Sequence, residues 1–284
     1  MSLDSEGAGF LKSNLFLRIC SAAVLAPLVL FAGWLGGWSF FALVLIVCIA
    51  VQFEWSRICR PNGSIFLLLF LAALCSLELL LIQMKLLDMA FLALAISIGS
   101  LIVFGIVRPQ KQWIGVGHAY AILFGVALLL LRHDAGFGVA ALIFVVGVVW
   151  GTDTFAYFVG RALGGPKLWP SISPGKTWSG AVGGAIAGLL LGYTLSHFVE
   201  GTSGIYLACV GLLLSCVSQL GDLFESWVKR RKGVKDSGQL IPGHGGMMDR
   251  VDGLIFASIA ALIIALVQGQ DFDRLGTLLL FGHQ

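Results

Sequence analysis

Residues 19–53 read ICSAAVLAPLVLFAGWLGGWSFFALVLIVCIAVQF, a run without a single Asp, Glu, Lys or Arg. A membrane-spanning helix needs about 20 predominantly apolar residues, and a glycine-containing turn at Gly33–Gly37 divides this run in two. The stretch therefore predicts two spanning helices, near residues 16–34 and 38–56, and it decides the fold class.

The remainder of the chain follows the same pattern. Hydrophobic residues make up 58% of the 284 residues and charged residues 12%, with a mean hydropathy of +0.95, whereas soluble domains carry about 25% charged residues. We predict an all-α integral membrane protein of about nine transmembrane helices. The seven further spans are expected near residues 64–83, 86–107, 114–131, 138–159, 178–198, 204–227 and 251–268.

The distribution of positive charge predicts how the chain is oriented. In the nine-span arrangement, 15 of the 18 Lys and Arg residues fall on the side of the N-terminus. Only Lys85, Arg132 and Arg274 fall on the other side. Because cytoplasmic loops hold the Lys and Arg excess, we expect the N-terminus in the cytoplasm and the C-terminus on the opposite side. We expect a membrane half at 1–113 (spans 1–4) and a second half, with the active site, at 114–284 (spans 5–9).

Charge is concentrated between Asp222 and Asp252, where five of the 15 acidic and six of the 18 basic residues lie. Ionisable residues near a bilayer usually mark a site. Four polar residues recur at positions i, i+3, i+4 and i+7 and so share one helix face: Asp222, Glu225, Ser226 and Lys229. Asp249 and Asp252 open the last predicted span, where carboxylates also suit the helix dipole.

Two carboxylate groups on adjoining helix ends form an oxygen-rich site that suits Mg²⁺, which prefers a few carboxylates together with water and substrate phosphates. The loop between them contains Lys235, Asp236 and the run Pro242–Gly246, whose basic and glycine groups are suited to phosphate oxygens. The plainer alternative is a positively charged membrane anchor followed by ordinary first-turn helix charges.

Two other segments repeat this chemistry. Asp153 lies within the sixth span, where it serves either as a structural hydrogen-bonding residue or as a substrate contact. Ser173, Lys176 and Thr177 precede the seventh span and form either a phosphate cradle at a helix start or an ordinary N-cap with a cytoplasmic lysine.

For several other residues the sequence indicates a structural role, and for Glu78 it indicates no role. A glycine recurs at every fourth position from Gly180 to Gly192, which favours close helix packing over a smooth wall for an acyl chain. Glu54 is interpreted as a structural partner of Arg57, and Glu78 has no visible partner. His118 and His197 are interpreted as membrane-interface residues.

The motif SWVKRRKGVKDSGQLIPGHGGMMDRVD at 226–252 resembles the signature of phosphatidate cytidylyltransferases, the CDP-diacylglycerol synthases. Asp153-Thr-Phe-Ala-Tyr157 and Ser173-Pro-Gly-Lys-Thr177 are similar to further motifs of that family. The resemblance covers residues 147–256. It implies the reaction of CTP with phosphatidate, which gives CDP-diacylglycerol and pyrophosphate.

The resemblance also implies a magnesium requirement, a second cation such as K⁺, and a homodimer in contact with membrane lipid, with no nucleic-acid partner. It favours the inner membrane of a bacterium, with the site facing the cytoplasm. By motif position, the catalytic group would be Asp222, Asp249, Lys229 and Arg230. The metal group would be Asp222, Asp249, Asp252, Glu225 and Ser226. The phosphate-binding group would be Lys176, Ser173, Thr177, Lys235, Asp236, His244, Gly245, Gly246, Arg250 and Asp153.

Two other functions compete with this prediction. A CTP-dependent kinase acting on a polyprenol or phytol would transfer the γ-phosphoryl group and release CDP. An ion-coupled transporter would use Asp153 and Asp222 inside the bundle, but the inverted repeats common in transporters are not visible. The long motif favours cytidylyl transfer.

Overall fold

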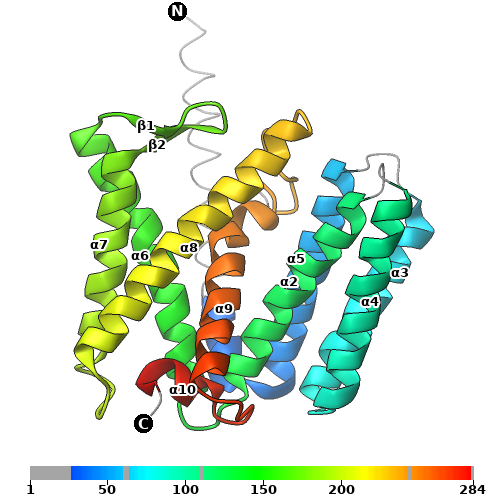
Figure 1. Cartoon of the computed structure of the whole chain (residues 1–284), viewed down its shortest axis with the longest axis horizontal. Coiled ribbons are helices and arrows are strands. Elements are labelled where there is room, and N and C mark those ends of the chain that lie inside the picture. The colour runs from blue at the N-terminus through cyan, green and yellow to red at the C-terminus, as the bar shows by residue number, and fades with distance from the viewer. Residues whose placement is uncertain (1–26, 60–63, 109–111, 242–244, 283–284) are drawn as a thin grey trace, which may run out of the picture.

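The computed structural model describes residues 27–59, 64–108, 112–241 and 245–282. Eight helices in this part of the chain are long and apolar enough to cross a membrane, which confirms the all-α integral membrane fold (Figure 1). They are α2 (Gly37–Cys59), α3 (Ile65–Gln83), α4 (Leu87–Val107), α5 (Gln112–Arg132), α6 (Gly138–Leu163), α7 (Trp178–Leu195), α8 (Gly204–Arg231) and α9 (Met248–Gln268). The first predicted span, 16–34, lies mostly outside the described residues, although 27–35 are helical.

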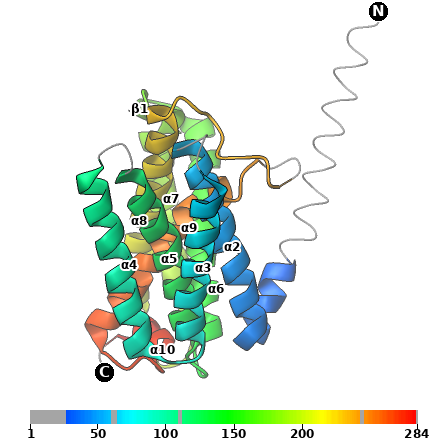
Figure 2. The same ribbon diagram turned by 90° about the vertical axis from the view of Figure 1, so that its right-hand side faces the viewer.

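Helix α5 is the first helix of the second predicted half, and most of it is buried in the bundle. It packs against α2, α3 and α4 of the first half, and against α9 of its own half (Figures 1 and 2). Gly117 allows the close approach of α2, because a Cβ atom at this position would lie 2.1 Å from the Trp55 ring. The helix thereby brings the two halves of the bundle together.

The glycine stripe of α7 packs against two helices, as the spacing predicts. A Cβ at Gly184 would lie 2.9 Å from the Thr152 carbonyl oxygen of α6, and one at Gly192 would lie 2.0 Å from the Leu207 carbonyl oxygen of α8. Helices α6, α7 and α8 therefore form one tightly packed group (Figure 1). Asp153 lies on α6 and Asp222 lies on α8 of this group.

The segment before α7 is a β-hairpin, an element that was not predicted from the sequence. Strands β1 (Lys167–Trp169) and β2 (Ser173–Thr177) pair antiparallel. The Thr177 hydroxyl then accepts a hydrogen bond from the Gly180 N–H at 3.1 Å, so Thr177 is the N-cap of α7. The hairpin fixes the direction in which Lys176 leaves the strand.

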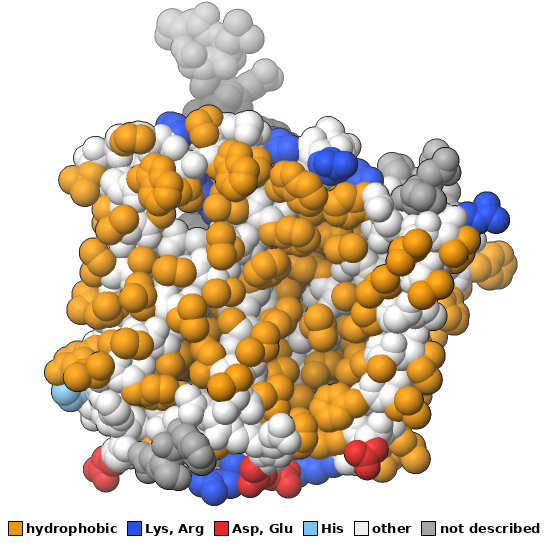
Figure 3. Space-filling view, in the orientation of Figure 1, with side chains coloured by type: hydrophobic (Ala, Val, Ile, Leu, Met, Phe, Trp, Pro, Cys, Tyr) orange, Lys and Arg blue, Asp and Glu red, His pale blue; other side chains and the backbone are white. Residues whose placement is uncertain are grey.

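The two ends of the bundle differ in charge. Figure 3 shows a flank covered with hydrophobic side chains, Lys and Arg at the upper edge, and Asp and Glu among the charges of the lower edge. The ends of α2, α4, α6 and α8 and the start of α9 lie at the upper end (Figure 1). This arrangement matches the predicted grouping of loops, while the assignment of the upper end to the cytoplasm stays a prediction.

Glu78, for which the sequence shows no partner, has buried partners in the structure. Its carboxylate lies 3.1 Å from His118 Nε2 and accepts a hydrogen bond from the Ser97 hydroxyl. Gln52 Nε2 lies 3.1 Å from His118 Nδ1. Glu78 and His118 have no exposed side-chain surface, so the interpretation of His118 as a membrane-interface residue was wrong. His118 lies on α5, and most side chains of this helix are buried inside the bundle.

At the lower end, Asp134 joins the α5–α6 turn to the short helix α10 (Leu275–Phe281). Its carboxylate accepts hydrogen bonds from the Gly136 and Phe137 N–H groups at 2.8 and 2.9 Å. It also accepts from the N–H and hydroxyl groups of Thr277 at 2.6 and 2.7 Å. Burial alone would raise the pKa of Asp134, but these hydrogen bonds outweigh it and hold the pKa below its usual range.

Candidate active site

The predicted polar face of α8 is present in the structure. Ser226 Oγ donates to Asp222 Oδ1 at 3.3 Å, and Lys229 Nζ lies 3.1 Å from Glu225 Oε1. Each pair is four residues apart, which is the spacing of neighbours on a helix surface. Because α8 runs unbroken to Arg231, all four side chains are held on one rigid element.

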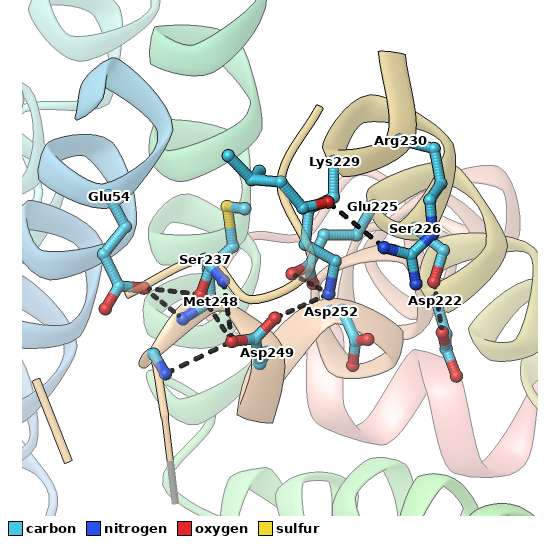
Figure 4. Close-up of polar contacts among 12 residues, drawn as sticks. Glu54, Asp222, Glu225, Ser226, Lys229, Arg230, Ser237, Met248, Asp249 and Asp252 are labelled. Carbon is cyan, nitrogen blue, oxygen red and sulfur yellow. Dashed lines mark hydrogen bonds and ion pairs between the residues drawn. The ribbon is translucent and has the colours of Figure 1, made fainter. Parts of the chain in front are cut away.

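Asp249, at the start of α9, is the most highly connected carboxylate of the site (Figure 4). Lys229 Nζ reaches its Oδ1 at 2.6 Å. Its Oδ2 accepts from the N–H and hydroxyl groups of Ser237 at 2.9 and 2.8 Å, and from the Gly246 N–H at 3.2 Å. Asp249 therefore ties α8, the 232–247 loop and α9 together, and it is held in place before any ligand binds.

A second carboxylate supports the same loop from α2. Glu54 is 2% exposed and accepts the N–H groups of Met247 and Met248 at 2.9 and 2.7 Å. It also accepts the Ser237 hydroxyl at 3.1 Å. These contacts satisfy N–H groups at the start of α9 that have no partner within the helix, at a helix end where a negative charge is favoured.

This role of Glu54 was missed from sequence, where it was interpreted as a partner of Arg57. The Arg57 guanidinium instead lies 5.6 Å from the centre of the Phe53 ring. The available signal was a single acidic residue at the end of an otherwise uncharged span, which by itself indicates a partner elsewhere in the bundle.

The loop glycines pack around Glu54. A Cβ at Gly246 would lie 1.8 Å from Ser237 Oγ and 2.8 Å from Glu54 Oε2, and one at Gly238 would lie 2.6 Å from Glu54 Oε1. The Gly245 N–H donates to the Ile241 carbonyl oxygen, and the Gly246 N–H donates to Asp249. Both N–H groups that the sequence assigned to phosphate are thus bonded within the protein, and we attribute these glycines to loop packing.

A second group of charges lies beside the first. Lys176 of β2 forms an ion pair with Asp222 Oδ2, and each side chain is just under one-third exposed. Asp153 of α6 is exposed rather than packed inside the bundle, and it interacts electrostatically with Asp222 and Lys176. Asp252 of α9 is repelled by both Asp222 and Asp153. Four elements, β2, α6, α8 and α9, therefore direct charged groups into one shared space.

The other predicted site residues are more dispersed. Arg230 donates to the carbonyl oxygens of Ile172 and Val234 at 3.3 and 3.2 Å, and so links α8 to the hairpin and the loop. Lys235, Asp236 and Arg250 are exposed. Ser173 begins β2, and His244 lies outside the described residues.

The donor set suits a hard divalent cation, although the carboxylates do not form a ready-made cage. Within the described ranges, no three Asp, Glu, His or Cys side chains are grouped closely enough to hold a metal ion by themselves. Glu225 is nevertheless fully buried, and its Oε2 makes no hydrogen bond to a described residue. Mg²⁺ takes one or two carboxylates and completes its shell with water and substrate phosphates, so the oxygen-rich cluster fits this ion.

Comparison with known proteins gives a consistent result. A family model described as the cytidylyltransferase family matches residues 16–267. The phosphatidate cytidylyltransferase of Brucella abortus (strain 2308) is 43% identical over 249 residues, which cover 87% of this chain and 91% of that protein. The phosphatidate cytidylyltransferase of Haemophilus influenzae is 36% identical over 275 residues, which cover 84% of this chain and 94% of that protein.

Proposed function

Since this chain belongs to the cytidylyltransferase family, and is thus a nucleotidyltransferase built as a membrane bundle, we propose that it makes CDP-diacylglycerol from CTP and phosphatidate. The relatives described above are named for that activity, and their similarity to this chain extends over nearly their full length. The observation that supports the proposal most strongly is the meeting of Lys176, Asp222, Lys229 and Asp249 at one end of the bundle.

The reaction needs little proton transfer. A phosphate monoester has its second ionisation near pH 6, so the phosphatidate phosphate is largely a dianion at neutral pH. One of its oxygens attacks the α-phosphorus of CTP and forms the new P–O bond. The bond from the α-phosphorus to the α,β-bridging oxygen breaks, and the electron pair leaves with pyrophosphate. We therefore assign no general base, and His244 no proton-transfer role.

The main barrier is the repulsion between two polyanions. Asp222, Asp249 and Asp252 would hold Mg²⁺, with Glu225 and Ser226 beside them. The bound ion would supply charge neutralisation at the phosphates and the leaving group. Lys176 and Lys229 are already fixed against carboxylates, so their positive charge is oriented in advance, which is the main requirement of electrostatic catalysis.

The position of the site suits a lipid substrate. The α8 and α9 ends that carry it lie at the end of the bundle that is rich in Lys and Arg (Figure 3). A phospholipid headgroup is held at the same depth, where the hydrophobic flank ends. We place this end in the cytoplasm of a bacterium, at its inner membrane, and propose a homodimer as the functional state.

The deciding experiment uses purified protein in detergent with phosphatidate, Mg²⁺ and CTP labelled separately at the α- and γ-phosphates. Transfer of the α-label into lipid, with the γ-label leaving as pyrophosphate, supports the proposal. Transfer of the γ-label into lipid would identify a CTP-dependent lipid kinase. If neither label moves with any lipid acceptor, the proposal fails.

Two further measurements test the metal and the oligomeric state. Chelation of Mg²⁺ in a parallel sample should abolish transfer. Light scattering of the protein–detergent complex tests the homodimer.

A further inference from the structure

A tyrosine of α5 packs against the two helices that carry the charged site. Tyr120 of α5 is 6% exposed, and its ring is packed among Trp55, Phe224 and Phe256, with centroid distances of 5.2, 5.9 and 6.2 Å. Phe224 precedes Glu225 on α8, and Phe256 lies one helical turn beyond Asp252 on α9. The ring is therefore wedged between the two helices that carry the carboxylates.

The Tyr120 hydroxyl is the one polar atom of a side chain that is otherwise packed among aromatic rings. It is buried without a hydrogen bond to any described residue. The carboxylates of Glu225, Asp252 and Asp222 act on it electrostatically. A buried hydroxyl that stays unpaired is costly, and native structures pair nearly all of them, directly or through bound water.

The complementary unpaired group belongs to Glu225. Its side chain is fully buried, its Oε1 lies 3.1 Å from Lys229 Nζ, and its Oε2 makes no hydrogen bond within the described part of the chain. A phenol donor without an acceptor and a carboxylate acceptor without a donor thus share one buried region. A direct hydrogen bond, or one bridging water, between the two groups would satisfy both of them.

We propose that Tyr120 is a positioning residue of the active site. Its hydroxyl donates a hydrogen bond, directly or through one bound water, to Oε2 of Glu225. This contact fixes Glu225, which in turn holds Lys229 between Glu225 and Asp249. The inference rests on the proposed cytidylyl transfer, because it makes the orientation of Lys229 toward the substrate phosphates depend on a residue of α5.

The aromatic ring and the hydroxyl have separable roles. Packing among three aromatic residues would be served equally well by phenylalanine, so Tyr120→Phe keeps the ring and removes only the proposed donor. Tyr206→Phe is the matched control, because it removes a hydroxyl that donates to the Leu279 carbonyl oxygen at 3.1 Å at the other end of the bundle.

The test combines kinetics with infrared spectroscopy. We expect Tyr120→Phe to lower kcat about 10-fold, within the usual range for a positioning group, with KM for CTP and the thermal midpoint unchanged. In a Glu225→Gln background the same substitution should change kcat less than twofold. In difference spectra, Tyr120→Phe should shift a carboxyl band that is absent from Glu225→Gln protein. Tyr206→Phe should leave kcat and the band as in the wild type.

Three results would overturn the proposal. These are an unchanged kcat in Tyr120→Phe, equal losses of kcat with and without Glu225, or a lowered thermal midpoint with unshifted carboxyl bands. The infrared measurement needs no turnover. If the wild-type protein failed to make CDP-diacylglycerol, the proposed function would fail while the contact between Tyr120 and Glu225 could still be measured.

Discussion

Glu54 accepts the backbone N–H of Met248 at 2.7 Å, across 194 positions of sequence. The contact joins the end of α2 to the first residue of α9, next to Asp249. Since Glu54 and Asp249 also share the Ser237 hydroxyl, the geometry of the active site depends on a helix of the N-terminal half.

Replacement of Glu54 should damage both stability and activity. Glu54→Gln keeps the size but leaves an amide NH₂ facing a backbone donor, so we expect a loss of about 1–3 kcal/mol in unfolding free energy. We also expect at least a 10-fold fall in rate, because Asp249 loses its fixed loop. Thermal melts and CTP turnover in the same detergent would measure both. Asp88→Asn, at an exposed position of α4, is the matched control, and equal behaviour of the two variants would refute the role.

Asp222→Asn and Asp249→Asn should each reduce turnover by about 100-fold or more, the scale of removing a preorganised charged group. Asparagine keeps the shape but cancels the ion pair with Lys176 or Lys229. Labelled-CTP assays on protein of unchanged monodispersity would measure the loss. Asp273→Asn, which breaks an exposed pair with Lys85 at the other end, should retain activity. Near-normal turnover in either site variant would remove that residue from the catalytic group.

The sequence predicted the helical elements and the α8 and α9 charges because these signals are local. Hydropathy marks a span within 20 residues, and helical spacing places Asp222 and Lys229 on one face. The contribution of Glu54 and the one proposed for Tyr120 were not predicted. Met247 and Met248 lie more than 190 positions from Glu54, Glu225 lies more than 100 positions from Tyr120, and no local pattern encodes these pairings. The β1–β2 hairpin was missed because its strands are short and contain Pro174, a residue that argues against a strand.

The buried pair of Glu78 and His118 predicts a large stability effect without a direct effect on catalysis. Removing one partner, as in His118→Ala, should cost about 3–5 kcal/mol, because it leaves an unpaired polar group in the bundle. The double variant Glu78→Met with His118→Leu should recover most of that loss. Denaturant or thermal unfolding of the three proteins measures it. A double variant less stable than the single one would contradict the argument.

The glycine packing of α7 can be tested with two alanines. Gly192→Ala would place a Cβ 2.0 Å from the Leu207 carbonyl oxygen, a backbone atom that cannot rotate away. We expect the thermal midpoint to fall, with a loss of about 1–3 kcal/mol from overpacking. Gly147→Ala is the control, since its Cβ would meet nothing within 4 Å, and it should be neutral or slightly stabilising because alanine favours helix. Equal midpoints for the two variants would show that α7 and α8 are not closely packed.

Asp134 predicts how one part of the stability depends on pH. Its folded pKa is lowered, so its contribution is fully present above the unfolded pKa of about 3.9 and is lost as the pH falls through the folded pKa. Asp134→Asn should therefore lower the thermal midpoint at pH 7, and the difference from wild type should shrink as the pH falls below about 4. Melting curves of the two proteins from pH 7 to pH 3 would measure this. A difference that stays constant across the range would mean that the hydrogen bonds from Thr277, rather than the carboxylate charge, hold α10 against the α5–α6 turn.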